Sequence, residues 1–197
     1  MKEIVMSRHQ IYFRYFTLFA SLILPAFHAI AEDVENPMYT NWAKFAIGTS
    51  VTNKAVTMQN GARVETFTTT ILISKTEKEL VVSSQISSDG TGKKIQNDVN
   101  LMKVNRLFPL LPGVDKTRIG RPQGAKEQGF ETIEVLGKKY QAEWYLTEAS
   151  TEAGPSFTKT WISMEMPGQV LKSVTEVKAA QKKVNLDVIE LKLGESK

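Results

Sequence analysis

The alternation of apolar and polar positions is clearest between residues 130 and 177, where it has a period of two. Successive residues of a strand point to opposite faces of a sheet, so such alternation is typical of half-buried strands. Gly137, Gly154 and Gly168 interrupt it where tight turns need a positive φ. The segment therefore predicts four consecutive antiparallel strands. One face of the second strand would gather Tyr140, Ala142, Trp144 and Leu146.

A second group of strands is predicted in the first half of the chain. It contains Asn60-Gly61, a strong two-residue signal for a hairpin turn, and a Thr-rich stretch at residues 66–70 that favours extended backbone. Four alternating segments separated by turns predict a meander. Their expected ranges are 49–59, 62–75, 78–87 and 93–104.

A last strand is expected at residues 184–193, where the apolar positions change phase near Val188. Either a β-bulge lies there or the strand is buried on both faces. The whole pattern predicts a mainly β fold. We expect a single antiparallel, strongly curved sheet or open barrel of about eight to ten strands, with one short N-terminal helix.

The helix is predicted at residues 36–48. Asn36 can cap its start, Pro37 suits the first helical position, and Gly48 can close the far end. One apolar face would plug an end of the sheet, which we favour, or would clasp a ligand as a lid. That face consists of Met38, Trp42 and Phe45.

A long connection at residues 105–129 separates the two groups of strands. Pro109, Pro112 and Pro122 cannot donate to a ladder, so no sheet strand is expected there. Long connections are often functional. This one either covers one end of the core, which we favour, or forms the mouth of a ligand site. Its candidates for contact with an anionic group are Arg106, Arg118 and Arg121.

The first 31 residues have the pattern of a secretory signal peptide. Basic residues precede an apolar run of about 14 residues that ends at an A-x-A site, Ala29-Ile30-Ala31. The run is shorter than the roughly 20 residues that a membrane-spanning helix needs. We expect export to the periplasm or the cell exterior, with no transmembrane anchor after cleavage. Residues 32–197 would form a single β domain with a flexible lead-in at 32–36.

Removing the signal changes the charge and the available chemistry. The formal net charge of +4 falls to about +2, because the signal holds three of the 25 basic residues and one of the 21 acidic residues, and nucleic-acid binding is not indicated. The chain has no cysteine, and both histidines, His9 and His28, lie in the signal. The mature chain therefore lacks the residues for Ser-His-Asp or Cys-His catalysis and for histidine-ligated zinc, so we predict no enzymatic activity and no cofactor.

Three functions remain open. We favour an exported structural or protein-interaction module with an envelope protein as its partner. The alternative is a carrier that binds an apolar or amphiphilic, lipid-like ligand on the concave face of the sheet. A carboxylate-dependent hydrolase is least favoured, because most glutamates lie on the polar phase of strands or in turns. The candidate ligand wall consists of Phe67, Leu107, Phe108, Leu110, Leu111, Trp144 and Trp161.

The two tryptophans of this wall are expected to differ. Trp144 shares its phase with apolar residues and should lie in the core. Trp161 shares its phase with Lys159 and Ser163, so it is the better candidate for a binding wall or an exposed contact.

Three stretches, NPMYTNWAKFAIGTSV, ETIEVLGKKYQAEWYLTE and KTWISMEMPGQVLKS, resemble a family of uncharacterised secreted bacterial proteins of about this size. The likeness covers nearly the whole mature chain. That family often has a cysteine near the position of Ala142, so nothing attached to its thiol transfers to this chain. By shape alone, the predicted sheet is similar to the half-barrels of bacterial lipoprotein carriers, which hold acyl chains on a concave face. Neither resemblance implies a catalytic residue.

Overall fold

The computed structural model describes residues 32–195 apart from 97 and 112, so the predicted signal peptide lies outside the described residues. The first group of strands is β1 (Glu32–Glu35), β2 (Ser50–Gln59), β3 (Ala62–Lys75), β4 (Glu79–Ser87), β5 (Asn100–Asn105) and β6 (Leu107–Leu110). The second is β7 (Ala125–Val135), β8 (Lys138–Thr151), β9 (Gly154–Ile162), β10 (Val170–Val177) and β11 (Lys182–Lys192). The helical elements are α1 (Pro37–Trp42), η1 (Lys116–Arg118) and η2 (Lys178–Ala180).

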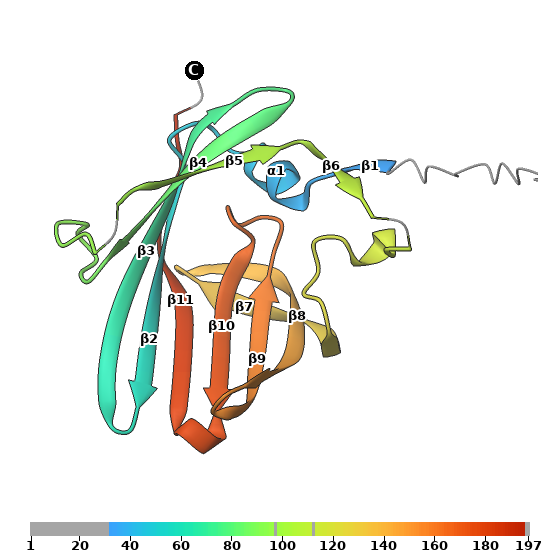
Figure 1. The fold of residues 1–197 in the computed structure, drawn as a ribbon. Coiled ribbons are helices and arrows are strands. Elements are labelled where there is room, and N and C mark those ends of the chain that lie inside the picture. Colours follow the sequence, from blue (N-terminus) through green and yellow to red (C-terminus); the bar gives the residue numbers. More distant parts are fainter. Residues whose placement is uncertain (1–31, 97, 112, 196–197) are drawn as a thin grey trace, which may run out of the picture. The chain divides into compact units, whose positions relative to one another are not determined.

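Nine of these strands form one antiparallel sheet in the order β5-β4-β3-β2-β11-β10-β9-β8-β7 (Figure 1). The sheet is not closed, and β5 and β7 are its edges. Strands β1 and β6 form a separate two-stranded ribbon. The predicted fold class, mainly β with one curved antiparallel sheet and a short helix, is confirmed.

Both predicted meanders are present, and their hairpins follow from local turn chemistry. Asn60 and Gly61 have φ values of 50° and 81°, the left-handed pair that a tight two-residue turn requires. The turn between β7 and β8 consists of Leu136 and Gly137, with φ values of 52° and 75°. It lies one residue earlier than expected, because Lys138 already pairs with the end of β7.

The last strand contains the predicted bulge. The register between β11 and β2 shifts between Val188 and Glu190, which confirms the bulge as the reason for the change of phase. Val188, which directly precedes the bulge, is buried in the core.

Three parts of the chain differ from the sequence prediction. Residues 32–35, expected to be flexible, form β1, which pairs with β6 inside the expected loop of 105–129. Pro109 is tolerated in β6, because each strand of a two-stranded ribbon leaves one side of its backbone unpaired. The strand expected from residue 93 starts only at Asn100, after the polar and glycine-containing turn.

Helix α1 is shorter than expected and ends at Trp42, although Asn36 caps it as predicted by accepting from the backbone N–H of Met38 at 3.0 Å. Trp42 is fully buried, and Met38 packs against the same core. The helix therefore plugs the core, as we favoured. Buried core residues from the sheet and its connections are Val51, Leu72, Leu80, Val82, Val104, Tyr140, Ala142, Met166, Leu171 and Val188.

Asn41 ties α1 to the connection between β9 and β10. Its side chain is fully buried, and its Nδ2 donates to the carbonyl oxygens of Met164 at 3.3 Å and Met166 at 2.8 Å. Its Oδ1 accepts from the backbone N–H of Gly168 at 2.8 Å. One amide thus satisfies three backbone groups and fixes the place of α1 beside the sheet.

Candidate functional site

The two candidate wall tryptophans lie side by side on one face of the sheet. Trp144 of β8 is the register partner of Trp161 of β9, and opposite residues of an antiparallel pair point to the same face. Both side chains are half-buried, and Trp161 packs against the core. The expected contrast between a core Trp144 and a wetter Trp161 is therefore not what the structure has.

A lysine and a glutamate fill the space between these indoles. The Nζ of Lys159 lies 4.2 Å from the ring centroid of Trp144 and 4.6 Å from that of Trp161. Glu131 of β7 accepts a hydrogen bond from Nε1–H of Trp161, and its carboxylate lies 3.7 Å from Lys159 Nζ. Gly129 leaves room for the indole of Trp144, since a Cβ there would lie 2.8 Å from the ring. We call Glu131, Trp144, Lys159 and Trp161 the tryptophan cluster.

The sheet curls so that β7 faces β10 and β11 beside this cluster. Ile133, Leu171 and Val188 from these three strands line one pocket of about 360 Å³, together with Trp161 and charged residues. In Figure 1, β7 and β8 accordingly pass behind β9 and β10. Within the tryptophan cluster, the Lys159 ammonium, the Glu131 carboxylate and the Trp161 N–H are paired with one another, which leaves little unpaired charge for a ligand.

The other wall residues lie elsewhere. Phe67 is half-buried on β3, four strands from β9 in the sheet order, with Lys54 Nζ 5.5 Å from its ring. Leu107 and Leu111 are exposed, at 47% and 70%. Leu110 is buried and Phe108 is half-buried. The structure thus separates the predicted wall into three places: Trp161 borders the pocket of about 360 Å³, and Phe108 and Leu110 of β6 border larger hollows.

Three hollows surround residues 113–124, which precede β7 and which we call the strap. The α1 hollow, of about 490 Å³, lies between Met38, Phe108 and Ile119. The η1 hollow, of about 570 Å³, lies within the strap and against Phe108. The Glu143 hollow, of about 430 Å³, is bordered by Ile119 and Glu143. All three share Ile119 and Gly120, and together we call them the strap cavity.

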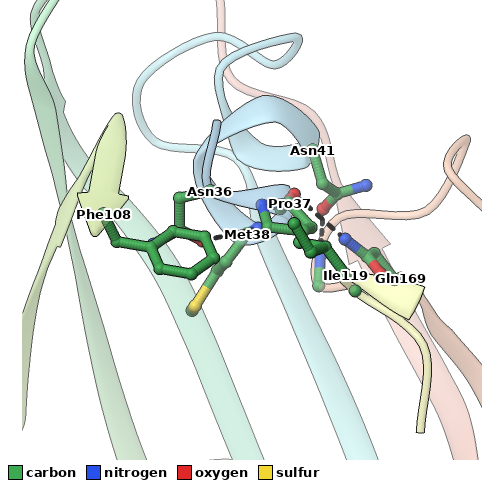
Figure 2. Close-up of a pocket in the computed structure, with 9 residues that line it drawn as sticks. Asn36, Pro37, Met38, Asn41, Phe108, Ile119 and Gln169 are labelled. Atoms are coloured by element: carbon green, nitrogen blue, oxygen red, sulfur yellow. Dashed lines mark hydrogen bonds between the residues drawn. The ribbon is translucent and has the colours of Figure 1, made fainter. Parts of the chain in front are cut away.

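Figure 2 shows how the wall of the α1 hollow is built. The ring of Phe108 lies beside Met38 on one side, and Ile119 lies near Pro37 and Gln169 on the other. Gln169 donates from Nε2 to the carbonyl oxygen of Pro37 at 3.1 Å, which links the start of α1 to the β9–β10 connection. Apolar side chains on a hydrogen-bonded frame are typical of a preformed small-molecule site.

Gly120 sets how closely the strap approaches α1. Its φ is 78°, and a Cβ at this position would lie 2.8 Å from the ring carbons of Pro37. Only glycine suits both the left-handed backbone and this contact. The strap therefore packs in direct contact with the start of α1.

The three arginines proposed for anionic contacts lie around this region with different partners. Arg106 pairs with Glu35 at 2.9 Å, and hydrogen bonding to this carboxylate raises its pKa. Arg121 lies 3.7 Å from Glu143 and borders two hollows. Arg118 borders the η1 hollow and forms no ion pair with the residues that the structure describes. Arg118 and Arg121 thus share a hollow, whereas Arg106 lies at the ribbon.

Behind Glu143, β8 carries a buried phenol that alternation did not predict. Tyr145 lies on the phase expected to be polar, yet it is 1% exposed, and its hydroxyl has no hydrogen-bond partner in the described part of the chain. Burial, and the neighbouring Glu143 carboxylate, raise the pKa of Tyr145 to about 12. Both faces of β8 are thus covered.

Sequence reasoning missed several residues of the strap cavity. Ile119 and Gly120 were placed in the long connection, but not as site residues, and Glu143 was assigned to a solvated face. The strap lies beside residues 36–41 through contacts between segments that are distant in sequence. The periodicity of the sequence could not predict such contacts. The cluster of proline, glycine and arginine in an unusually long connection was the available clue.

Across the described residues, no three histidine, cysteine or acidic side chains gather in a group that could hold a metal ion. No helix of that part of the chain has both the length and the apolar character needed to cross a bilayer.

No protein-family model matches the chain, and no curated protein matches it significantly. An exported protein with a YmcC-like fold from Bacteroides fragilis is 9% identical, with a TM-score of 0.46 over 75% of this chain and 97% of that chain. The lipoprotein LppX of Mycobacterium tuberculosis is 11% identical, with a TM-score of 0.39 over 78% and 91%. A LolA superfamily protein from Nitrosomonas europaea is 12% identical, with a TM-score of 0.30 over 83% and 96%.

These structures are similar to this chain in the arrangement of their strands. A LolA superfamily protein is among these structures. With TM-scores below 0.5, the likenesses carry no argument about ligand, activity or partner.

Proposed function

We propose that this protein is an exported, non-enzymatic binding protein that holds an amphiphilic molecule in the strap cavity. The observation that supports this most is the meeting of three hollows, of about 430 to 570 Å³, at Ile119 and Gly120. Binding sites for small molecules have volumes of this order and walls that are mostly apolar with a few polar groups. The proposed site thus lies at the strap and not on the concave face of the sheet, where the sequence predicted it.

The walls of the cavity have both kinds of surface that an amphiphile needs. Phe108, Ile119 and Ile162 provide apolar contact, and each lies on a different segment of the chain. Arg118 and Arg121 lie in the same hollow as Phe108 and are exposed to solvent. A molecule with an apolar chain and a polar head would therefore satisfy the cavity better than a purely apolar one.

The test is calorimetric titration of the exported protein with monodecanoylglycerol, a neutral amphiphile. An Ile119→Asp variant should bind at least about tenfold more weakly, because it places a charge in the apolar wall. Ile73→Asp is the matched control, since Ile73 is 46% exposed on β3 and borders none of the three hollows. Absence of binding, or equal binding by the Ile119→Asp variant, would exclude the strap cavity as the site.

A protein-interaction role is the second candidate, and the edge strand β5 supports it. Leu101 and Met102 are 64% and 42% exposed on a strand with a neighbour on one side only. Such an edge can add a strand from another polypeptide, in the first instance a second copy of this chain. Sedimentation equilibrium would then detect self-association, and Leu101→Lys should weaken it. A monomer at all concentrations would argue against this role.

A further inference from the structure

Among the paired cations around the strap cavity, Arg121 forms the longest ion pair. Its guanidinium lies 3.7 Å from the Glu143 carboxylate, beyond the 2.7–2.9 Å typical of a charge-assisted hydrogen bond. Its side chain is 44% exposed, and it borders both the η1 hollow and the Glu143 hollow. A second anion can therefore reach it from either hollow.

Two other cations near the cavity have closer partners. Arg106 pairs with Glu35 at 2.9 Å, and Lys116 pairs with Glu32 at 2.5 Å. These pairs hold the β1–β6 ribbon and the strap together. Arg106 and Lys116 are thus engaged in the frame, and Arg121 is left to act in the site.

The acidic residue closest to the arginines in sequence is also engaged. Asp115 accepts from the backbone N–H of Thr117 at 2.9 Å and from its hydroxyl at 2.8 Å, and so caps η1. The Thr117 bonds and then the nearby arginines lower the pKa of Asp115. The carboxylate stays ionised at neutral pH, while Arg118 keeps no ion pair within the described residues.

Glu143 has a second partner within reach. The hydroxyl of Tyr145 is buried and lies close enough to the Glu143 carboxylate to raise the pKa of the phenol, yet no hydrogen bond of normal geometry joins the two groups in the described residues. An unsatisfied buried hydroxyl costs free energy that a hydrogen bond to a carboxylate would recover. If Glu143 leaves Arg121, it can therefore accept from Tyr145.

We propose that the amphiphile carries an anionic headgroup, phosphate or carboxylate, and this inference rests on the proposed function. The headgroup binds Arg121 and displaces the Glu143 carboxylate from it. The apolar chain lies against Phe108, Leu110 and Ile119, which share the η1 hollow with both arginines. The planar guanidinium of Arg121 can bind either oxyanion through two parallel hydrogen bonds. Arg118, in the same hollow, adds a second positive charge.

After this exchange the ligand's oxyanion, the Arg121 guanidinium and the Glu143 carboxylate each have a hydrogen-bond partner, and the partner of Glu143 is a neutral hydroxyl instead of a cation. The ligand's oxyanion replaces the Glu143 carboxylate at Arg121, and the carboxylate gains the Tyr145 hydroxyl. The pKa of Tyr145, raised to about 12, keeps that hydroxyl protonated and able to donate at neutral pH. A neutral headgroup would drive no such exchange, because Arg121 would lose its carboxylate without gaining another.

The test compares three amphiphiles of equal chain length by calorimetry: decyl phosphate, decanoate and monodecanoylglycerol. We expect the anionic ligands to bind about tenfold more tightly than the neutral one. Arg121→Gln should remove most of that difference, because only Arg118 then remains to attract the anion. Glu143→Gln should instead increase affinity for the anions by about threefold to tenfold, because no carboxylate then competes for Arg121. The matched controls are Arg63→Gln and Glu65→Gln, which alter an ion pair on the β2–β3 hairpin and should change neither affinity.

The outcomes separate this inference from the function on which it rests. Equal binding of all three ligands, with no effect of Arg121→Gln, would overturn the anionic headgroup and leave the amphiphile site intact. Weaker binding of anions by the Glu143→Gln variant would overturn the exchange. Binding of none of the three would overturn both. Tighter binding of only decyl phosphate or only decanoate would support the exchange and identify the oxyanion.

Discussion

Glu143 and Trp144 are neighbours on β8 and point to opposite faces, so one strand borders two regions of contrasting character. On the Trp144 side, the tryptophan cluster pairs indoles, an ammonium and a carboxylate with one another. On the Glu143 side, hollows, a long ion pair and an unsatisfied hydroxyl lie together. The Trp144 side has paired charges beside a pocket of about 360 Å³ and suits stability, whereas the Glu143 side has larger hollows and less complete pairing and suits binding. Substitutions on each side should therefore affect different measurements.

The largest effect is expected where a residue serves both the fold and the strap cavity. Asn41 borders the α1 hollow and satisfies three backbone groups of the β9–β10 connection. Asn41→Ala would leave the Gly168 N–H and the Met164 carbonyl without their side-chain partner, while the Met166 carbonyl keeps the N–H of Gln169. It would also open a cavity at a fully buried position, so the free energy of unfolding should fall by about 4 kcal/mol. Urea denaturation followed by circular dichroism measures this. Asn100→Ala, at an exposed position on β5, should cost almost nothing, and a similar loss in both variants would contradict the assigned role.

Substitutions in the tryptophan cluster should lower stability without altering ligand affinity. Trp161→Ala removes a half-buried indole and leaves Glu131 without its donor, which should cost about 3 kcal/mol. Amphiphile affinity at a temperature well below the melting transition should not change. Phe130→Ala, on β7 with 80% exposure, is the control and should be nearly neutral. Loss of affinity in the Trp161→Ala variant would place the ligand on the sheet face and remove the contrast between the two regions.

The two faces of β8 also show what the sequence can and cannot predict. Alternation predicted which residues of β8 share a face, and Asn60-Gly61 predicted its hairpin, because both depend on near neighbours along the chain. Alternation does not say what covers a face. Tyr145 is buried although its phase is polar, and Trp144 is only half-buried although its phase is apolar.

The strap shows the same limit for the site. Its arginines and long unpatterned stretch were recognised, but its contact with α1 joins Gly120 to Pro37 across the first half of the domain. Strand β1 was missed for a similar reason, since four mostly acidic residues become a strand only through their partner β6. Both features depend on pairing between distant segments, which composition and period do not encode.

A smaller effect, on binding more than on stability, is expected at the contact between strap and helix. Gly120→Ala would strain a left-handed backbone and press a methyl group onto Pro37, costing about 1 to 2 kcal/mol and weakening amphiphile binding. Gly61→Ala is the control, because Gly61 also has a positive φ, nothing lies within 4 Å of its added Cβ, and it borders none of the three hollows. Titration of both variants should separate the two contributions. Equal affinities would show that the approach of the strap to α1 does not shape the cavity.

The smallest effect on stability is expected from removing single tyrosine hydroxyls, and its sign should differ between Tyr145 and Tyr39. Tyr145→Phe removes a buried hydroxyl that lacks a partner, so the free protein should be unchanged or more stable by up to about 1 kcal/mol. Tyr39→Phe removes a hydroxyl that donates to the carbonyl oxygen of Thr76 at 2.7 Å, so stability should fall by about 0.5 to 1 kcal/mol. In thermal melts, a shift of about 2 to 4 °C corresponds to 1 kcal/mol for a domain of this size.

The same variant should weaken the binding of an anionic amphiphile, because Glu143 would then leave Arg121 without gaining the phenol. A stabilised free protein with reduced affinity for anions would show that the Tyr145 hydroxyl is kept for the bound state. Destabilisation by Tyr145→Phe would instead mean that the hydroxyl is already satisfied without ligand, and the Glu143 side would then be as complete as the tryptophan cluster.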